Sequence, residues 1–359
     1  MTPEALARQL APIAAPLVDW YRQNARVLPW RENTDPYRVW VSEIMLQQTR
    51  VTAVIPYYLR FLEALPTPAA LAACPEDRLM KLWEGLGYYS RARNMQKAAR
   101  VMVERYGGQL PSSFEDLKAL PGVGEYTAGA VASIALGLPC PAVDGNVLRV
   151  VSRLAASRED IAAPQVKKDF SAALSAVIPR DCPGDFTQAL MELGACVCLP
   201  GGDPLCGGCP LWDLCRARAL GIQGRLPVKA PKKARRQEEH TVFVLEREGL
   251  LPLMKRPEKG LLRGLWQPPM AAGHLDGEEA RAALSAMGFL AMDLRPLPPA
   301  RHIFTHVQWE LVGWQARVSG DGPRDFRWFT PRALLEEAAV PTAFAAYLGG
   351  KALKGPIPR

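Results

Sequence analysis

The sequence has no long hydrophobic run and no segment with the layout of an export signal. No apolar stretch reaches the roughly 20 residues that a helix needs to span a bilayer, which argues against a membrane protein. The N-terminal segment has Glu4 where an export signal would be basic and Asp19 near the point where a cleavage site would follow. With 48% hydrophobic residues, the composition is that of a soluble globular protein. We therefore expect a folded cytoplasmic protein.

The sequence also lacks the features of a disulfide-bonded protein. It contains eight cysteines, but without an export signal they face a reducing compartment that keeps thiols free. Five of the eight lie between Cys196 and Cys215, and this clustering indicates a separate role. The other three, Cys74, Cys140 and Cys182, have the usual character of buried small side chains.

Basic residues outnumber acidic ones, and the formal net charge is +8. A basic surface gains affinity for a polyanion by releasing counterions from its phosphates, so nucleic acid is a favoured partner. The same excess also suits mere solubility, and charge alone leaves both interpretations open. The length of 359 residues favours two domains.

Strands are scarce in the first part of the chain. Over residues 1–220, apolar residues recur at three- and four-residue spacing between proline and glycine turns, which predicts an all-α domain. One helix, or two, starts near Asp35, with Pro36 at the first helical position. From 239 to 359, β-branched and aromatic residues alternate between turns, which predicts a separate α+β domain.

Residues 221–238 indicate an interdomain linker, because they are basic and poor in large apolar residues. This linker is either a solvated tether or a segment that also holds phosphates. Its cations are Arg225, Lys229, Lys232, Lys233, Arg235 and Arg236.

The segment LKALPGVGEYTAGAVASIAL joins a short helix to a longer one through a glycine turn. Gly122 and Gly124 allow a tight turn and a close approach of a ligand to the backbone. The free N–H groups at the start of the second helix favour an anion such as a DNA phosphate. An ordinary helix–helix turn is the weaker interpretation.

The segment CLPGGDPLCGGCPLWDLC brings four thiols into a short span. Thiolates at such spacing suit a [4Fe–4S] cluster or a tetrahedral zinc ion. The candidate ligands are Cys198, Cys206, Cys209 and Cys215.

The glycine turn and the cysteine segment together resemble the helix-hairpin-helix DNA glycosylases that carry a downstream aspartate. The resemblance makes Asp144 that aspartate, although an Asp before Gly145 and Asn146 is also typical of a turn or a helix N-cap. It favours a [4Fe–4S] cluster over zinc. Members of the family have six residues between the first two ligands, and this chain has seven; we expect the loop containing Gly201 and Gly202 to absorb the extra one.

Two further segments, LPWRENTDPYRVWVSEIMLQQTRVTAVIPYY and WEGLGYYSRARN, are very similar to the MutY family of adenine DNA glycosylases. A carboxyl among apolar neighbours keeps its proton near neutral pH, so Glu43 is a candidate general acid for adenine release. On one helix Glu43 and Gln47 would share a face, with Leu46 beside them. The alternative interpretation of Glu43 is an ordinary carboxylate on the solvated face of a helix. The resemblance implies that Asp144 stabilises the oxocarbenium-like sugar.

The resemblance implies further roles. Tyr126 stands where strand-cutting relatives of the endonuclease III type have a nucleophilic lysine, so we expect base removal without dedicated strand cleavage. Tyr126 and Asn146 would position the reacting groups, and Gln48 and Tyr88 would fill the gap left by an extruded base. The remaining pocket walls would be Arg26, Trp30, Arg31 and Gln188.

The C-terminal part resembles a Nudix fold in the segment KRPEKGLLRGLWQPPM. Its helical segment GEEARAALSAMGFL lacks the acidic cluster that a Nudix hydrolase needs for magnesium, so we expect binding rather than hydrolysis. In the MutY family this domain reads 8-oxoguanine opposite adenine, and the resemblance assigns that contact to Phe304, Thr305 and His306.

The sequence therefore predicts a monomeric, monofunctional glycosylase acting on adenine paired with 8-oxoguanine or guanine in double-stranded DNA. Three alternatives stay open: an endonuclease III-like lyase, a Nudix nucleotide hydrolase with a DNA-binding appendage, and a lesion binder without catalysis. Tyr126 argues against the first, and the missing acidic cluster argues against the second.

Overall fold

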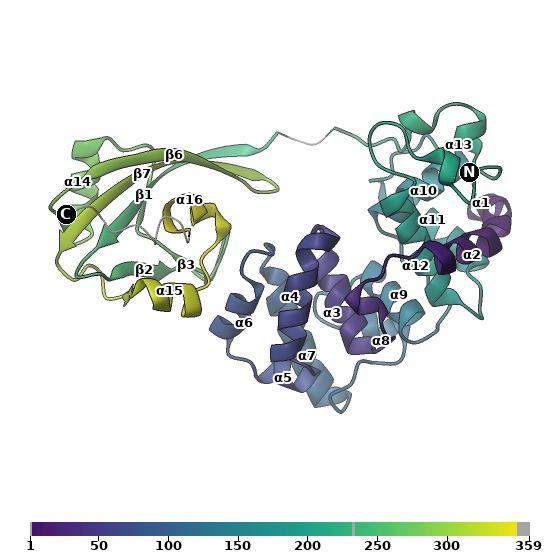
Figure 1. The fold of residues 1–359 in the computed structure, drawn as a ribbon, viewed down its shortest axis with the longest axis horizontal. Coiled ribbons are helices and arrows are strands. Elements are labelled where there is room, and N and C mark those ends of the chain that lie inside the picture. Colours follow the sequence, from purple (N-terminus) through teal and green to yellow (C-terminus); the bar gives the residue numbers. More distant parts are fainter. Residues whose placement is uncertain (1, 232–233, 350–359) are drawn as a thin grey trace. The chain divides into compact units, whose positions relative to one another are not determined.

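The computed structural model describes residues 2–231 and 234–349, which form two compact units (Figure 1). The first unit comprises residues 1–73 and 93–231, and the second comprises 74–92 and 232–359. Lys232 and Lys233 of the predicted linker, and the last residues of the predicted 239–359 domain, lie outside the described residues. The domain limits 1–220, 221–238 and 239–359 stay a prediction.

The first unit is helical, as predicted. Its one described β-bridge joins Asp160 to Val228. Its helices in chain order are α1 (Pro3–Leu10), η1 (Ala11–Ile13), α2 (Ala14–Asn24), η2 (Pro29–Arg31), α3 (Pro36–Leu46), α4 (Val51–Ala64), α5 (Pro68–Ala73), α7 (Ser90–Arg105, beginning in the second unit), α8 (Phe114–Ala119), α9 (Glu125–Ile134), α10 (Gly145–Ala155), α11 (Pro164–Val177), α12 (Pro183–Cys196), η3 (Cys206–Gly208), α13 (Arg216–Ala219) and η4 (Gln223–Arg225).

The helical segment that was predicted from Asp35 forms two helices. Asp35 caps α3 by accepting a hydrogen bond from the Arg38 N–H at 2.8 Å, and Pro36 occupies the first helical position. The break before α4 centres on Gln48, whose φ of 57° lies in the left-handed region. No helix can continue through that conformation, so the chain turns between Leu46 and Val51.

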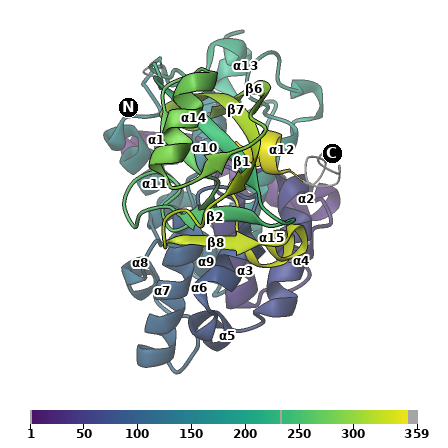
Figure 2. The same ribbon diagram turned by 90° about the vertical axis from the view of Figure 1, so that its left-hand side faces the viewer.

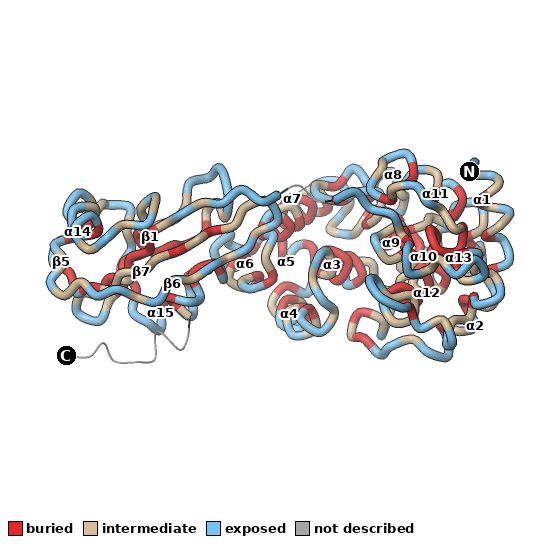
Figure 3. Tube along the Cα trace, turned by 90° about the horizontal axis from the view of Figure 1, so that it is seen from above, coloured by how far each residue is buried: buried red, intermediate tan, exposed pale blue. Residues whose placement is uncertain are grey.

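The core of the first unit fixes the start of α10 against α12. Val147, Val151 and Leu154 on α10 belong to one buried cluster with Phe186 and Leu190 of α12. Each such side chain contributes about 1.5–3 kcal/mol when it is fully buried. In Figure 3 both helices carry long buried stretches. This packing gives the residue that precedes α10, Asp144, a rigid support.

The second unit contains two sheets. In the larger sheet the order is β4-β1-β7-β5, with β6 also paired to β7. In the smaller sheet the order is β3-β2-β8. β1 runs parallel to β7 in register from Arg236↔Val307 to Glu246↔Arg317, and β6 is antiparallel to β7. The strands are β1 (Arg236–Glu246), β2 (Leu251–Lys255), β3 (Trp266–Gln267), β4 (Met270–Ala272), β5 (Leu290–Ala291), β6 (Arg295–Ile303), β7 (Val307–Ser319) and β8 (Phe326–Phe329).

The strand β1 separates two buried clusters because its side chains alternate between the faces of the sheet. Val242 packs with Trp309 and Phe344, whereas its neighbour Phe243 packs with Phe289 beneath α14. Figure 2 shows α14 near β1, β6 and β7, and shows β2 beside β8. The helices of this unit are α6 (Glu76–Trp83), α14 (Gly277–Ala286), α15 (Pro331–Glu337), η5 (Thr342–Phe344) and α16 (Ala345–Leu348).

The helix α6 is attached to the end of α15 within this unit. Lys81 Nζ donates to the Ala338 carbonyl at 3.0 Å, and the Val340 N–H donates to Glu84 Oε1 at 2.7 Å. The predicted α+β architecture of the C-terminal part is confirmed. Across the described chain, no helix has both the length and the apolar character that crossing a bilayer requires.

Candidate active site

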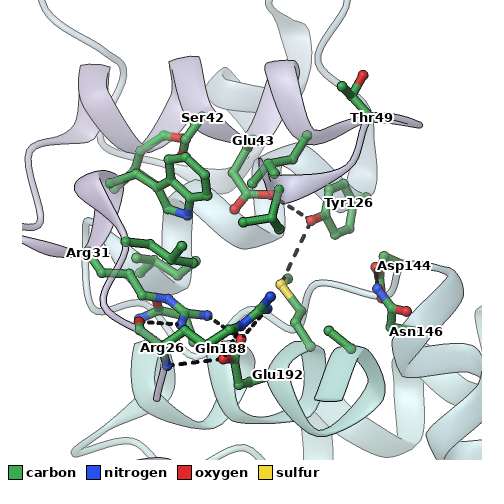
Figure 4. Close-up of a pocket in the computed structure, with 18 residues that line it drawn as sticks. Arg26, Arg31, Ser42, Glu43, Thr49, Tyr126, Asp144, Asn146, Gln188 and Glu192 are labelled. Atoms are coloured by element: carbon green, nitrogen blue, oxygen red, sulfur yellow. Dashed lines mark hydrogen bonds and ion pairs between the residues drawn. The ribbon is translucent and has the colours of Figure 1, made fainter. Parts of the chain in front are cut away.

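One pocket of the first unit gathers all the predicted catalytic residues and several of the predicted base-binding residues (Figure 4). It encloses about 770 Å³ of empty space, part of it open to solvent. Apolar side chains, among them Leu28, Val39 and Leu46, form much of its surface. The predicted site residues that line it are Arg26, Trp30, Arg31, Glu43, Tyr126, Asp144, Asn146 and Gln188.

Glu43 projects into this pocket from α3 and is only 6% exposed. Burial raises the pKa of its carboxyl to about 7, a hydrogen bond from Tyr126 opposes the rise, and the charge of Asp144 adds to it. A carboxyl with such a pKa holds a proton in about half of the molecules at neutral pH. Glu43 is thus a buried acid, and the interpretation as a solvated helix carboxylate does not hold.

Tyr126 fixes the orientation of the Glu43 carboxyl. Its hydroxyl donates to Glu43 Oε2 at 2.6 Å, and the Met191 sulfur lies 3.8 Å from the same hydroxyl (Figure 4). Burial raises the pKa of Tyr126 well above 10, so the phenol keeps its proton. The first turn of α9 therefore supplies a fixed donor to the carboxyl of α3, across 83 residues of sequence.

Gln47 shares with Glu43 the side of α3 that faces α9, as expected. It is the C-cap of α3, its φ of -57° is still helical, and its Nε2 donates to Thr127 Oγ1 at 3.2 Å. Glu43 accepts from Tyr126, the residue before Thr127 on the same helix. Leu46 lines the pocket, whereas Gln47 is not among the lining residues.

Asp144 is both a pocket residue and the N-cap of α10. Its Oδ1 accepts from the Val147 N–H at 2.8 Å, and its Oδ2 accepts from Asn146 Nδ2 at 2.8 Å. Burial raises the pKa of Asp144, while these hydrogen bonds and Arg149 oppose the rise. The positive end of the α10 dipole also favours its anionic form. The interpretation of Asp144 as an N-cap is confirmed, and its role in the reaction stays a prediction that its place in the pocket allows.

Asn146 is held on its other side. Its Oδ1 accepts from Arg149 Nη2 at 2.9 Å, and Arg149 also donates to the Gly194 carbonyl at 2.7 Å. A Cβ at Gly194 would lie 2.6 Å from Asn146 Cβ, so only glycine lets α12 approach this closely. The amide nitrogen of Asn146 consequently points to Asp144.

Glu192 is a pocket residue that the sequence analysis missed. It lies on α12, one turn after Gln188, and its side chain is 1% exposed. Burial works against its charge, but hydrogen bonds from Arg26 and Arg31 outweigh burial and lower its pKa to about 2. An acidic residue within the apolar run DFTQALMELGACV was the available signal, but nothing in the sequence indicates its partners.

The predicted glycine turn connects α8 to α9. Gly122 has a φ of 78°, and a Cβ there would lie 2.6 Å from Asn94 Cβ. Gly124 is the N-cap of α9, and a Cβ at that position would meet nothing within 4 Å. Gly124 and Glu125 are exposed, so an anion can reach the N-terminal end of α9.

Other predicted DNA-contacting residues lie outside the pocket. Gln48 occupies the turn between α3 and α4. Tyr88, with φ 47°, belongs to the second unit, and its hydroxyl lies 2.7 Å from Thr305 Oγ1. Thr305 and His306 are exposed at the turn between β6 and β7. The ring of Phe304, next to them, packs edge-on against Trp309 at 4.9 Å.

The four predicted cysteine ligands line one further cavity in the first unit. The loop before Cys206 closes through a 2.9 Å hydrogen bond from the Leu205 N–H to the Val197 carbonyl. Gly201 and Gly202, with φ of 59° and 81°, give this loop its turn. That the loop absorbs the extra residue stays a prediction. The cavity is lined by Cys198, Cys206, Cys209 and Cys215, together with Arg153, Val197, Pro204, Trp212, Arg218 and Gln223.

The four thiols line one cavity, and four thiolates are the donor set of an iron–sulfur cluster. Within the described residues, no three His, Cys, Asp or Glu side chains lie close enough together to hold one metal ion. Arg153 Nη1 donates to Cys198 Sγ at 3.2 Å, and such a donor stabilises a thiolate.

Comparisons with known proteins agree with this geometry. Residues 41–175 match the HhH-GPD superfamily of base excision DNA repair proteins, and residues 241–349 match the NUDIX domain. An adenine DNA glycosylase of Homo sapiens is 36% identical over 416 aligned residues, covering 96% of this chain and 76% of that protein. An adenine DNA glycosylase of Mus musculus is 37% identical, covering 91% and 75%. The structure of a thermostable thymine-DNA glycosylase is 26% identical, with a TM-score of 0.54 over 59% of this chain and 98% of that one.

Proposed function

The chain belongs to the adenine DNA glycosylases, and from this premise we propose that it removes adenine paired with 8-oxoguanine or guanine in double-stranded DNA. It is an enzyme that hydrolyses an N-glycosyl bond. The observation that carries the proposal is the buried, proton-holding Glu43 in a pocket that also contains Asp144. Because a base inside the duplex cannot reach such a pocket, the adenine enters it as an extruded nucleotide.

Glu43 acts as the general acid. Adenine is a poor leaving group as an anion, but protonation at N7 lets it depart as a neutral base while the electrons of the N9–C1′ bond move into the purine. A carboxyl with a pKa of about 7 is suited to give that proton near neutral pH. The pKa of Glu192, which also lines the pocket, is lowered to about 2. Glu192 is therefore ionised near neutral pH and has no proton to donate.

Asp144 stabilises the positive sugar that remains. Its carboxylate accepts hydrogen bonds from the Val147 N–H and from Asn146, which hold the group in place as charge develops. Water then attacks C1′ and gives its proton to the Glu43 carboxylate, which restores the acid. Tyr126 keeps Glu43 oriented through both steps by its 2.6 Å hydrogen bond.

The enzyme is monofunctional. Cleavage of the strand through a Schiff base needs an amine nucleophile, and none of the residues that line this pocket, all within the described chain, is a lysine. Tyr126 stands at the corresponding position and is already engaged with Glu43. This supports hydrolysis of the N-glycosyl bond alone, without cleavage of the strand.

The second unit reads the base opposite adenine. Phe304, Thr305 and His306 at the β6–β7 turn contact 8-oxoguanine, and Tyr88 and Gln48 occupy the duplex where adenine has left. Their left-handed backbone, at φ 47° for Tyr88 and 57° for Gln48, is a costly conformation in residues other than glycine. Such cost is common at sites of recognition, which supports these roles. Arg26, Trp30, Arg31 and Gln188 form the adenine pocket, and Gly122 and Gly124 hold a phosphate.

A [4Fe–4S] cluster is held by Cys198, Cys206, Cys209 and Cys215. When bound, it joins the segment 198–215 covalently and stiffens it against α10, and no redox step is assigned to it. The protein acts as a monomer in the cytoplasm.

Incubation with a duplex that contains adenine opposite 8-oxoguanine tests the function. We expect strand breakage only after alkali, which cleaves the abasic site left by base removal. Breakage without alkali, trapped by borohydride, would support the lyase alternative. Tight binding with no break under either condition would support the lesion binder, and pyrophosphate release from 8-oxo-dGTP would support the Nudix hydrolase.

A further inference from the structure

One wall of the adenine pocket is not held by a helix. It consists of the short segment 26–31, of which only Pro29–Arg31 forms a turn of 3-10 helix. The segment nevertheless supplies four lining residues, Arg26, Leu28, Trp30 and Arg31. A segment with so little regular structure needs an external anchor if it is to present those side chains in one arrangement.

The carboxylate of Glu192 supplies that anchor. Its Oε1 accepts from the Arg26 N–H at 3.1 Å and from Arg26 Nε at 2.6 Å. Its Oε2 accepts from Arg26 Nη2 at 2.8 Å and from Arg31 Nη2 at 2.9 Å. One side chain therefore holds both ends of the segment, through the backbone as well as through two guanidinium groups. Figure 4 shows this ion-pair network at the edge of the pocket across from Asp144.

The network is buried on the carboxylate side and more open on the arginine side. The Glu192 side chain is 1% exposed, against 39% for Arg26 and 15% for Arg31. Four hydrogen bonds, two on each oxygen, satisfy the Glu192 carboxylate, so neither oxygen is left to take part in the chemistry. The Arg31 guanidinium is further held over the Tyr21 ring at 5.4 Å.

We propose that Glu192 is a positioning residue of the glycosylase reaction, which holds the 26–31 wall against the extruded adenine and neutralises Arg26 and Arg31, two arginines that line the same pocket as Glu43. This inference rests on the proposed function. It assigns no contact between Glu192 and the reacting atoms.

The balance of charge around Glu43 matters because hydrogen-bonding and charged groups from several elements act on its carboxyl. Tyr126 of α9 donates to it, Asp144 before α10 raises its pKa, and Arg31 lowers it. The partner of that arginine, Glu192, comes from α12, and Arg26 completes the network. Removing the Glu192 charge leaves two cations without a counter-charge, which favours the ionised form of Glu43. The acid would then lose its proton at a lower pH.

Two substitutions separate charge from placement. Glu192→Gln removes the charge and keeps the size, whereas Glu192→Asp keeps the charge and withdraws it by one methylene. The matched control is Asp185→Asn on the same helix, which breaks an exposed 2.8 Å pair with Arg22. Asp185 is not among the residues that line the pocket.

The measurement is single-turnover excision by the full-length protein with its cluster, on the duplex with adenine opposite 8-oxoguanine, between pH 5.5 and 9. For Glu192→Gln we expect a rate reduced by about 100-fold, as misplacement of a substrate-binding group produces, and a high-pH inflection lowered by about half a unit or more. For Glu192→Asp we expect an excision rate about tenfold below that of the wild type, with the high-pH inflection at the wild-type position. Asp185→Asn should match the wild type in both.

Binding to the product duplex, which carries an abasic site and no adenine, distinguishes positioning from general damage. The affinity for this duplex should stay within about threefold of wild type for both Glu192 variants, because they alter only the 26–31 wall of the adenine pocket. Wild-type excision by Glu192→Asp, or an unmoved inflection in a folded Glu192→Gln, would overturn the inference. If Glu192→Gln does not fold, the Asp variant decides alone. Absence of excision by the wild-type protein would instead refute the proposed function.

Discussion

Replacing Glu43 by glutamine should abolish excision and stabilise the fold. The amide has nearly the same size and can still accept the hydrogen bond from Tyr126, but it has no acidic proton to give. General acid catalysis contributes about 10²- to 10⁴-fold, so we expect a loss within or beyond that range while binding of the mismatched duplex is retained. Substantial residual single-turnover excision would refute the assignment of the acid.

The stability gain follows from the pKa of the same carboxyl. It is about 7 in the folded chain, against an ordinary value of 4.5, so 7 − 4.5 gives a rise of about 2.5 units. A carboxyl whose pKa is raised by folding leaves stability intact below pH 4.5 and costs stability as pH rises toward 7. At 1.36 kcal/mol per unit, the cost of Glu43 grows from about 2 kcal/mol at pH 6 to about 3 kcal/mol at pH 8.5. Glutamine carries no such cost at any pH.

Urea unfolding of both proteins, followed by tryptophan fluorescence from pH 6 to 8.5, measures this difference. Other titrating groups are common to the two proteins and cancel when the variant is compared with the wild type. The variant should be the more stable protein, by a margin that widens by about 1 kcal/mol over this range. A margin that is constant with pH, or that narrows as pH rises, would show that Glu43 is not a desolvated carboxyl.

Three further predictions concern the turn, the cluster and the β6–β7 loop. Gly122→Ala should lower the free energy of unfolding by about 1–3 kcal/mol and weaken DNA binding, because φ is 78° and the new Cβ would lie 2.6 Å from Asn94 Cβ. Gly124→Ala, with open space at its Cβ, should change the urea midpoint little. Equal losses of stability in the two variants would contradict the geometry. Cys209→Ser should lose the visible absorbance and the iron content of the cluster, whereas Cys182→Ser should keep both; full iron content in the Cys209 variant would exclude it as a ligand. Phe304→Ala should reduce the preference for 8-oxoguanine over guanine opposite adenine, in competitive single-turnover assays, by about tenfold. The exposed neighbour Ile303→Ala is its control, and an unchanged preference in the Phe304 variant would refute the reading role.

The sequence predicted the elements whose signals are local. Pro36 after Asp35 marked the start of α3, and the glycines at 122 and 124 marked the turn before α9. Alternating apolar residues such as those of β1 identified the second domain as α+β. These signals depend on a few adjacent residues and on the fixed periods of helix and strand, so no tertiary information was needed.

The break between α3 and α4 was left open by the sequence. The segment LQQTR contains neither proline nor glycine, and nothing in it indicates that Gln48 adopts a left-handed conformation. Strain of this kind is maintained by the surrounding structure, which local propensity does not describe.

The site was partly predictable. Resemblance to a family indicated Glu43, Tyr126 and Asp144, which the fold brings to one pocket from distant positions. Glu192 was missed because its importance lies in its partners, Arg26 and Arg31, more than 160 residues earlier in the chain. A buried carboxylate is recognised by what satisfies it, and that requires the structure. The attachment of residues 74–92 to the second unit was missed for the same reason.

The pH dependence of single-turnover excision by the wild-type protein tests the central claim most directly. If a protonated Glu43 with a pKa of about 7 delivers the proton, the rate should be level below the inflection wherever Asp144 is ionised, and fall about tenfold for each unit above the inflection. A rate that rises with pH through this range would mean that the essential group must first lose its proton, and Glu43 would not be the acid.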